Sequence, residues 1–410
     1  MPDSAAPPIA PAARTRQAVW KPVLFVTGLT ALAFNLRAAI TGVPPVFPEL
    51  ASRLNLSPTA IAVLAAVPVL CFAVFAPAAA PLSRRFGEER VLLAAAALLA
   101  AGLLLRGAVP GLLLFPGTVL AAGAIAFMNV LLPSLVKRRW PARAGLLIGI
   151  YLLGLCGGAI LGSLVAVPVF QASGGSVSLT LGMWALPAIA AALVWLPQGR
   201  FRTVPGSPDG SQRDRPQLVK VSRHLLAWQV MAFMGLQSLT YYAALSWLPI
   251  LFRDRGAGAV TAGTLLALMN LGNAATALLM PVLAHRVRDQ RALVVVALTA
   301  SAGGLAGVWL APVSTAAAWT LLLGLGQGAT LGLAIYLTTA RAPDPVAAAS
   351  LSAFTQGGGY LIATAGPLLV GFLHSATGGW SVPMVALLAV FAAELLAGWH
   401  GARDRTLPTA

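Results

Sequence analysis

Long apolar stretches separated by short polar ones run through the whole chain. A membrane-spanning helix needs about 20 mostly apolar residues, and twelve segments meet this requirement. A membrane β-barrel would need short alternating segments instead. We therefore predict an all-α membrane protein with twelve transmembrane helices. The predicted segments are 22–48, 58–81, 91–109, 111–134, 144–170, 178–196, 224–252, 260–284, 292–311, 316–340, 347–373 and 380–399.

The composition agrees with this pattern. Hydrophobic residues make up 58% of the chain and charged residues 9%, whereas soluble domains average about 25% charged residues. The mean hydropathy is +0.84. We expect the lipid bilayer to be the surroundings of most of the chain.

The net charge of +16 is distributed unevenly along the helix ends. Twenty-two of the 27 lysine and arginine residues lie at one set of segment ends, and one, Arg37, lies within a segment. This asymmetry is the positive-inside signature, so we predict that both termini face the cytoplasm. The charge reflects topology, and we expect no nucleic-acid binding. The other set of ends carries Arg53, Arg106, Arg253 and Arg255.

A polar segment divides the chain into two halves of six predicted helices. The stretch QGRFRTVPGSPDGSQRDRPQLVK (198–220) is rich in Pro, Gly and charge, as expected of a linker. The halves also resemble each other weakly, because Pro45 matches Pro249 at an offset of 204. Two six-helix bundles are typical of transporters that alternate access. The predicted parts are a disordered cytoplasmic tail (1–20), an N-terminal bundle (21–197), a cytoplasmic linker (198–222), a C-terminal bundle (223–400) and a cytoplasmic tail (401–410).

Several motifs resemble those of the major facilitator superfamily. The loop after the second helix usually reads G-x-L-A-D-R-x-G-R-K there, and APLSRRFGEER (80–90) matches it at Leu82, Arg85 and Gly87. Arg84 stands where Asp is expected, which departs from the usual charge lock between the halves. NLRAAITGVPP (35–45) and LQSLTYYAALSWLP (236–249) are similar to the cyanate and 2-nitroimidazole transporters of that superfamily. The resemblance implies a multi-pass transporter of the plasma (inner) membrane, which we expect to be a monomer.

Arg37 is a charged residue inside an apolar segment. A guanidinium at the centre of a membrane helix costs about 2.5–3.5 kcal/mol on insertion scales. Thr30, Arg37 and Thr41 are spaced seven and four residues apart and so share one helix face. We predict that this face borders a cavity and that Arg37 contacts substrate, because its donors suit a planar oxyanion or nitro group. The alternative is an Arg that snorkels to the surface or caps the carbonyls of a broken helix.

Neutral polar residues form further stripes on other predicted helices. Each of them could contact substrate or form a hydrogen bond between helices. Tyr242 points about 100° away from Tyr241 on a helix, so we expect it to be less central. For Asn35 we favour an interhelical bond, because it shares a face with Gly28 and Gly42. The substrate-binding candidates besides Arg37 are Thr41, Asn129, Gln237, Tyr241, Asn270, Asn273, Gln327, Gln356 and Tyr360.

These features favour transport of a small molecule over catalysis. There is no Walker loop, no dinucleotide-binding glycine turn and no Cys/His cluster with metal-ligand spacing, so we expect no enzyme activity, cofactor or metal. One hypothesis is transport of a small anion with Arg37 as its charge partner. The other is export of a neutral or weakly acidic aromatic compound, in which the tyrosines dominate. We interpret Glu394 as interfacial and expect no carboxylate near mid-membrane to carry a coupling proton.

Overall fold

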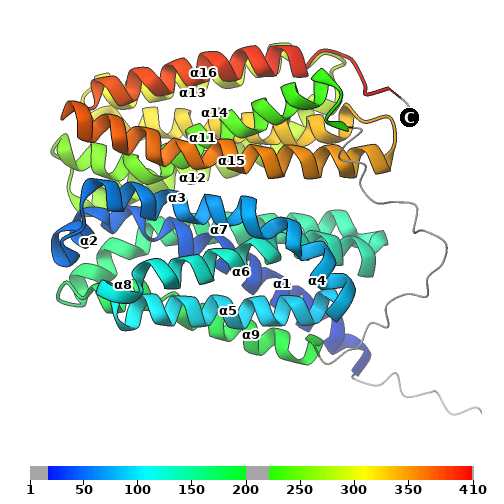
Figure 1. Ribbon diagram of the computed structural model, residues 1–410, viewed down its shortest axis with the longest axis horizontal. Coiled ribbons are helices and arrows are strands. Elements are labelled where there is room, and N and C mark those ends of the chain that lie inside the picture. Colours follow the sequence, from blue (N-terminus) through cyan, green and yellow to red (C-terminus); the bar gives the residue numbers. More distant parts are fainter. Residues whose placement is uncertain (1–16, 200–220, 409–410) are drawn as a thin grey trace, which may run out of the picture.

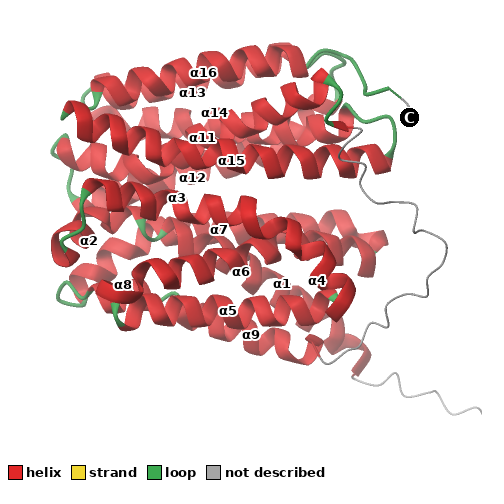
Figure 2. Cartoon of the chain, in the orientation of Figure 1, coloured by secondary structure: helices red, strands yellow, loops and turns green. Residues whose placement is uncertain are grey.

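The computed structural model describes residues 17–199 and 221–408, and these consist of helices and connecting loops (Figure 2). The helices run along the long axis of the molecule in two groups, which follow each other in the chain (Figure 1). The prediction of an all-α protein is confirmed within the described residues. The predicted tail 1–20 and linker 198–222 lie largely outside them.

The N-terminal half holds the first group. Its elements are α1 (Gln17–Thr41), η1 (Pro44–Val46), α2 (Phe47–Leu54), α3 (Pro58–Phe75), η2 (Ala76–Ala78), α4 (Ala79–Phe86), α5 (Glu88–Ala108), α6 (Pro110–Arg139), η3 (Pro141–Arg143), α7 (Ala144–Ala172), α8 (Val177–Gly182) and α9 (Ala185–Gly199). Prolines divide the first predicted segment: α1 ends before Pro44 and Pro45, which cannot continue a helix hydrogen-bond ladder. This segment is therefore divided into α1, η1 and α2.

The C-terminal half holds the second group. Its elements are α11 (Leu225–Asp254), α12 (Ala259–His285), α13 (Arg291–Leu310), η4 (Val313–Thr315), α14 (Ala316–Ala340), α15 (Pro345–Thr377) and α16 (Ser381–Gly401). Each predicted segment from 224 onward corresponds to one of the six long helices. They are continuous, whereas three of the six predicted segments before the linker are divided into shorter elements.

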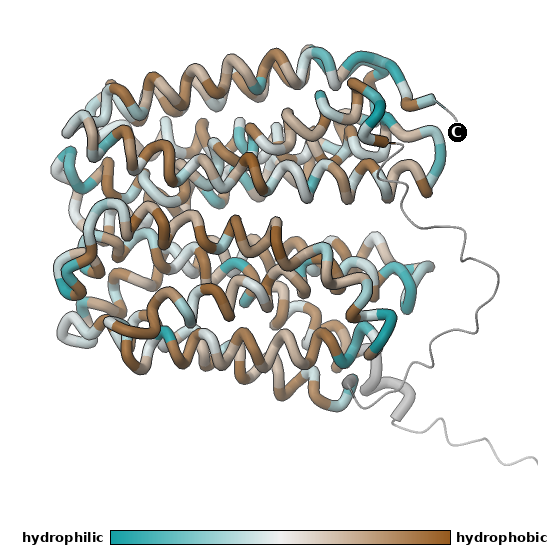
Figure 3. The backbone as a smooth tube through the Cα atoms, viewed as in Figure 1, coloured by the Kyte–Doolittle hydropathy of each residue, from teal (hydrophilic) through white to brown (hydrophobic). Residues whose placement is uncertain are grey.

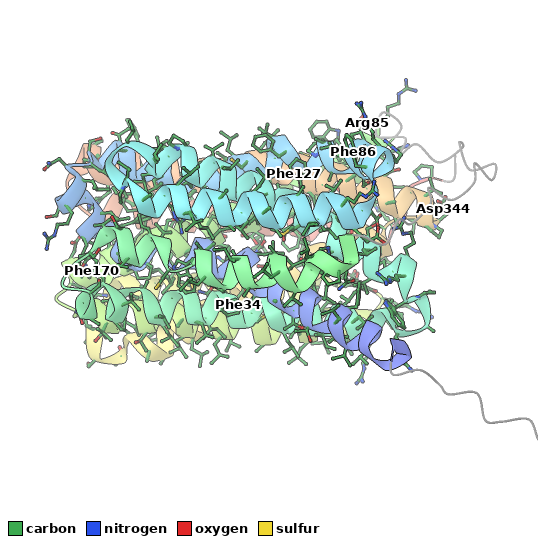
Figure 4. The ribbon with its side chains drawn as sticks, turned by 90° about the horizontal axis from the view of Figure 1, so that it is seen from below. Phe34, Arg85, Phe86, Phe127, Phe170 and Asp344 are labelled. Carbon is green, nitrogen blue, oxygen red and sulfur yellow. The ribbon has the colours of Figure 1, made fainter. Side chains whose placement is uncertain are left out.

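The two ends of the molecule are polar and the middle is apolar (Figure 3). We call the end where α9 stops and α11 begins the linker end, and the opposite end the α2 end. Arg85 and Asp344 lie at the linker end, Phe170 lies at the α2 end, and Phe34 lies between them (Figure 4). This layering matches the thickness of a bilayer crossed by helices of 20–33 residues.

Eleven helical stretches among the described residues are long and apolar enough to cross a membrane. The remaining predicted span, α11, has 30 residues but falls short of the same hydropathy because it contains Gln237, Thr240 and two tyrosines. The burial of its polar residues inside the protein compensates for this lower hydropathy. Every residue from Gln237 to Pro249 is buried, so this part of α11 has no lipid-facing side.

Small residues allow close contact between α1 and α7. A Cβ atom added to Gly158 would lie 2.1 Å from the carbonyl oxygen of Phe34, a distance that no side chain tolerates. Gly154 and Gly162, one turn to either side, also face α1. α7 therefore packs closely against the helix that carries Arg37.

The halves meet where α3 packs against α15 and α7 packs against α12. Near the α2 end, Gly371 of α15 contacts Ala62 of α3. Among the hydrogen bonds, ion pairs and ring contacts between the halves, the one closest to the linker end joins the rings of Phe72 and Tyr360, with centroids 5.6 Å apart. Every hydrogen bond, ion pair and ring contact between described residues of the two halves lies from this level toward the α2 end.

Candidate substrate site

Arg37 lies in the last turn but one of α1, where the halves meet. Its Nη1 donates a hydrogen bond of 3.3 Å to the hydroxyl of Tyr242 on α11. The side chain is partly exposed, and it forms no ion pair with any described residue. The remaining guanidinium donors are therefore available to a ligand.

Four of the five tyrosines of the chain lie near enough to this guanidinium to interact with its charge: Tyr151, Tyr241, Tyr242 and Tyr360. The Arg37 Cζ atom lies 6.0 Å from the ring centroid of Tyr241, within the range of a cation–π contact. The rings of Tyr241 and Tyr242 are perpendicular neighbours with centroids 5.3 Å apart. The site therefore combines one cation with four phenol side chains, and we call these four tyrosines the tyrosine collar.

The expectation that Tyr242 is less central than Tyr241 is not supported by this geometry. Tyr242 meets Arg37 through its hydroxyl, and Tyr241 meets it through its ring. Directions about 100° apart on one helix can both reach a guanidinium that lies between them. The helix period correctly predicts the angle between the two tyrosine side chains. It could not predict that Arg37 lies between their two directions.

Two asparagines hold tyrosines of the collar in place. The Tyr241 hydroxyl donates to Oδ1 of Asn270 at 3.0 Å, and Asn270 Nδ2 donates to the Ser163 hydroxyl of α7 at 3.2 Å. The Tyr151 hydroxyl donates to Oδ1 of Asn129 at 3.5 Å. Asn129 and Asn270 therefore lie behind the phenols that face Arg37.

The two predicted candidates on α15 lie at different depths. Tyr360 is partly exposed and its ring meets Phe72 of the other half. Gln356 lies one turn nearer the linker end, is exposed, and donates to the Ser352 hydroxyl at 2.9 Å. Tyr360 belongs to the collar around Arg37, whereas Gln356 is about 6 Å further along the helix axis.

Thr41 is tied to the protein backbone. Its hydroxyl is buried and lies 3.0 Å from the carbonyl oxygens of both Arg37 and Ala159. Because the single hydroxyl proton is shared between these two acceptors, it joins the end of α1 to α7. Asn35 acts in the same way, since its Nδ2 donates to the Pro187 carbonyl at 3.0 Å. The predicted interhelical bond of Asn35 is confirmed.

The candidates on α11 and α14 form a separate network inside the C-terminal half. Gln237 Nε2 lies 3.4 Å from Oε1 of Gln327, and Gln327 Nε2 donates to the Thr240 hydroxyl at 3.0 Å. Both glutamines are buried. Asn273 is partly exposed, and its Nδ2 has no hydrogen-bond partner in the described chain. Gln237, Gln327 and Thr240 therefore join α11 to α14 and do not extend the group of tyrosines around Arg37.

Two charged residues are buried by neighbouring helices, and one of them, Glu394, differs from its predicted position. Glu394 is not interfacial: it is fully buried beside Thr240, and its carboxyl oxygens have no hydrogen-bond partner among the described residues. The reason is that α16 packs against α11 and α13 and turns this face inward. Arg106, counted with the charges at helix ends, is also buried. Its Nη1 donates to the Ala39 carbonyl at 3.2 Å.

A family model described as the Major Facilitator Superfamily matches residues 23–364. The chain belongs to this superfamily. It is 36% identical to the 2-nitroimidazole transporter of Escherichia coli over 94% of this chain and 97% of that protein. It is 33% identical to the cyanate transport protein CynX of the same organism over 86% of this chain and 90% of that protein.

A solved structure supports the same fold. A bacterial homologue of the human lysosomal transporter Spinster matches with a TM-score of 0.75 at 15% identity, over 94% of this chain and 98% of that one. The predicted family resemblance is confirmed. The superfamily and these relatives identify the chain as a multi-pass transporter of the plasma membrane and not as an enzyme.

Proposed function

We propose that this transporter moves a small anion across the membrane by alternating access, with Arg37 as the charge partner. The observation that carries the proposal is a guanidinium between the halves with one hydrogen bond and no acidic partner in the described chain. A charge away from bulk water is costly unless it is paired. A bound anion would supply the missing partner.

The surroundings of Arg37 favour one negative charge. The collar adds hydroxyl groups and aromatic rings but no second cation, so a di- or polyanion would remain undercompensated. The planar guanidinium fork suits a small planar or linear anion. The relative named as a cyanate transport protein is consistent with this class.

The contacts between the halves support a direction of opening. They extend from the level of Phe72 and Tyr360 to the α2 end, so the α2 end is the closed one. Because most of the lysines and arginines lie at the linker end, the positive-inside rule assigns that end to the cytoplasm. We infer a monomer whose site is open toward the cytoplasm here and which opens the α2 end in the other half of its cycle.

The tyrosine collar favours a second candidate, export of a small neutral or weakly acidic aromatic compound. Phenol rings and Phe72 could stack on a flat ring, while Arg37 binds its polar substituent. The relative named as a 2-nitroimidazole transporter fits this candidate. In this case Arg37 would orient the substrate rather than neutralise it.

Flux into proteoliposomes separates the two candidates. Purified protein would be reconstituted and supplied with labelled cyanate, thiocyanate or 2-nitroimidazole, each against empty liposomes. Anion transport predicts saturable cyanate or thiocyanate flux that responds to an imposed membrane potential. Saturable flux of 2-nitroimidazole alone, independent of the potential, would favour the aromatic exporter.

A further inference from the structure

We propose that the small cavity beside Arg106 is a second anion site, which binds a small monovalent inorganic anion. The cavity lies between α1, α3, α5, α6 and α11 and has a volume of about 30 Å³. Its polar lining consists of Arg106, Thr118, Tyr242 and Ser246, and the rest is apolar. The role of this site in transport rests on the proposed function, whereas anion binding to it does not.

The charge of Arg106 is only partly compensated by the protein. Nη1 and Nη2 donate to the carbonyls of Ala39 and Leu181 at 3.2 and 3.5 Å. These carbonyls end α1 and α8 and carry the partial negative charge of a helix C-terminus, about half a unit each. The Nε group is buried without any hydrogen-bond partner in the described chain. Buried cations normally have a carboxylate as well.

The cavity offers hydrogen-bond donors and no carboxylate. The Tyr242 oxygen accepts from Arg37, so its own proton is free to donate to another acceptor. The Ser246 hydroxyl forms no hydrogen bond with a described residue, and the Thr118 hydroxyl is used by the Leu114 carbonyl at 2.6 Å. A guanidinium with two free hydroxyls is a donor set for an anion and would repel a metal cation.

The size of the cavity restricts the ligand. About 30 Å³ of accessible volume holds one or two water molecules. A halide or the end of a linear triatomic anion fits this space, whereas a sulfate, an aromatic acid or gluconate does not. Small size and single charge are also the properties inferred for the substrate at Arg37.

The Tyr242 side chain connects the two cationic sites. Its hydroxyl touches Arg37, and the same side chain lines the cavity of Arg106. The cavity is also lined by Ile40, Val43 and Pro44, which follow Arg37 toward the α2 end. An anion that moves from Arg37 toward the α2 end therefore reaches Arg106 next. The bound anion is either a substrate in transit or a resident counter-ion of the same chemistry.

Thermal unfolding of the detergent-purified transporter tests whether the site exists. Bromide would replace gluconate at constant ionic strength, for the wild type and for Arg106→Met, Arg37→Met and Arg255→Met. Arg255 is the matched control, because its guanidinium also binds carbonyls at a helix end, those of Val308 and Ala311, and it does not line the cavity.

We expect bromide to raise the unfolding midpoint of the wild type, of Arg37→Met and of Arg255→Met, with a saturable dependence. Arg106→Met should weaken the apparent bromide affinity at least about tenfold, which is 1.4 kcal/mol. An unchanged bromide response in Arg106→Met overturns the proposal. If Arg106→Met does not fold, Ser246→Asp replaces it in the Arg37→Met background, where the proposed substrate site no longer binds anions. A fixed carboxylate in the cavity should remove the bromide response there, and a retained response again overturns the proposal.

Flux measurements distinguish the two sources of the anion. If the site holds a resident ion, labelled thiocyanate flux requires bromide or chloride; if the site holds substrate in transit, bromide competes with thiocyanate. Either effect of bromide on thiocyanate flux supports an anion site at Arg106, provided that the effect is lost in Arg106→Met. Absence of any anion flux in wild type while the bromide response persists would refute the proposed function and leave the Arg106 site standing.

Discussion

Glu49 of α2 and Arg253 of α11 form an ion pair that joins the two halves at the α2 end. They are 204 residues apart, the offset that also relates Pro45 to Pro249. Equivalent positions of the two halves thus meet each other across the internal symmetry of the chain. The pair is well placed to hold the α2 end closed.

Reversing one charge of this pair should open the α2 end. In Arg253→Glu, two carboxylates would face each other, and we expect the population open at this end to rise about tenfold, because like-charge contacts cost several kcal/mol. The measurement is alkylation of Leu245→Cys by a membrane-impermeant maleimide, in a background with Cys71→Ala and Cys156→Ala. The combined exchange Glu49→Arg with Arg253→Glu should restore protection. Equal labelling of the single and combined variants would contradict a role for the pair.

Replacement of Arg37 should abolish transport without unfolding the protein. A membrane helix gains about 2.5–3.5 kcal/mol of insertion free energy when it loses a central guanidinium, so Arg37→Ala should retain its unfolding midpoint. Arg37→Lys should also transport poorly, because an ammonium cannot form bidentate contacts. Flux and thermal unfolding are measured on the same samples. A large drop in midpoint for Arg37→Ala would mean that Arg37 is structural.

The two neighbouring tyrosines should differ in their effect on affinity. Tyr242→Phe removes the acceptor of the Arg37 hydrogen bond, so we expect the KM for the anion to rise about five- to tenfold. Tyr241→Phe breaks a bond to Asn270 behind the site and should change KM less. This order is the reverse of the one expected from helix geometry alone. Flux at varied substrate concentration decides between the two orders.

Glu394→Gln should be tolerated in both stability and flux. An unpaired ionised carboxylate in an apolar interior is costly, so the buried group is expected to be neutral, and glutamine preserves its shape and neutrality. We expect the unfolding free energy to change by less than about 1 kcal/mol. Loss of substrate-driven proton uptake in Glu394→Gln, with stability retained, would instead identify Glu394 as a coupling residue.

Gly158→Ala should separate α1 from α7. The new Cβ would lie 2.1 Å from the Phe34 carbonyl, and such overpacking costs about 1–3 kcal/mol. Gly157→Ala is the matched control, because nothing lies within 4 Å of an added Cβ there. We expect a lower unfolding midpoint and reduced flux for the first variant and no loss for the second. Equal effects would indicate that helix propensity, not contact, is being measured.

The sequence was informative about helices and less informative about their neighbours. Hydropathy located the spans, and the small-residue face of Gly28, Asn35 and Gly42 correctly indicated a tightly packed helix: Gly28 lies against Trp195 and Gly42 against Trp184. Periodicity describes a face relative to its own helix axis. It could not show which helix each face meets, and therefore it missed the contact between Tyr242 and Arg37.

The burial of Arg106 and Glu394 has the same physical explanation. Arg106 lies three residues from the start of the loop and Glu394 six residues from His400, positions that are usually interfacial in a single membrane helix. Their burial results from neighbouring helices that cover them, α1 and α8 for Arg106 and α11 for Glu394. No sequence pattern within the two segments predicts that neighbouring helices bury these residues.

The enclosed middle of α11 has a consequence for how the chain enters the membrane. Because it contains Gln237, Thr240 and two tyrosines, this helix inserts less favourably into the bilayer on its own than the other spans do. The helices that cover it within its half, α12, α14, α15 and α16, are all synthesised after it. Stable insertion of α11 must therefore await partners made up to about 150 residues later, at roughly 5–20 residues per second. Biogenesis of the C-terminal half is a collective event, completed by its last helix.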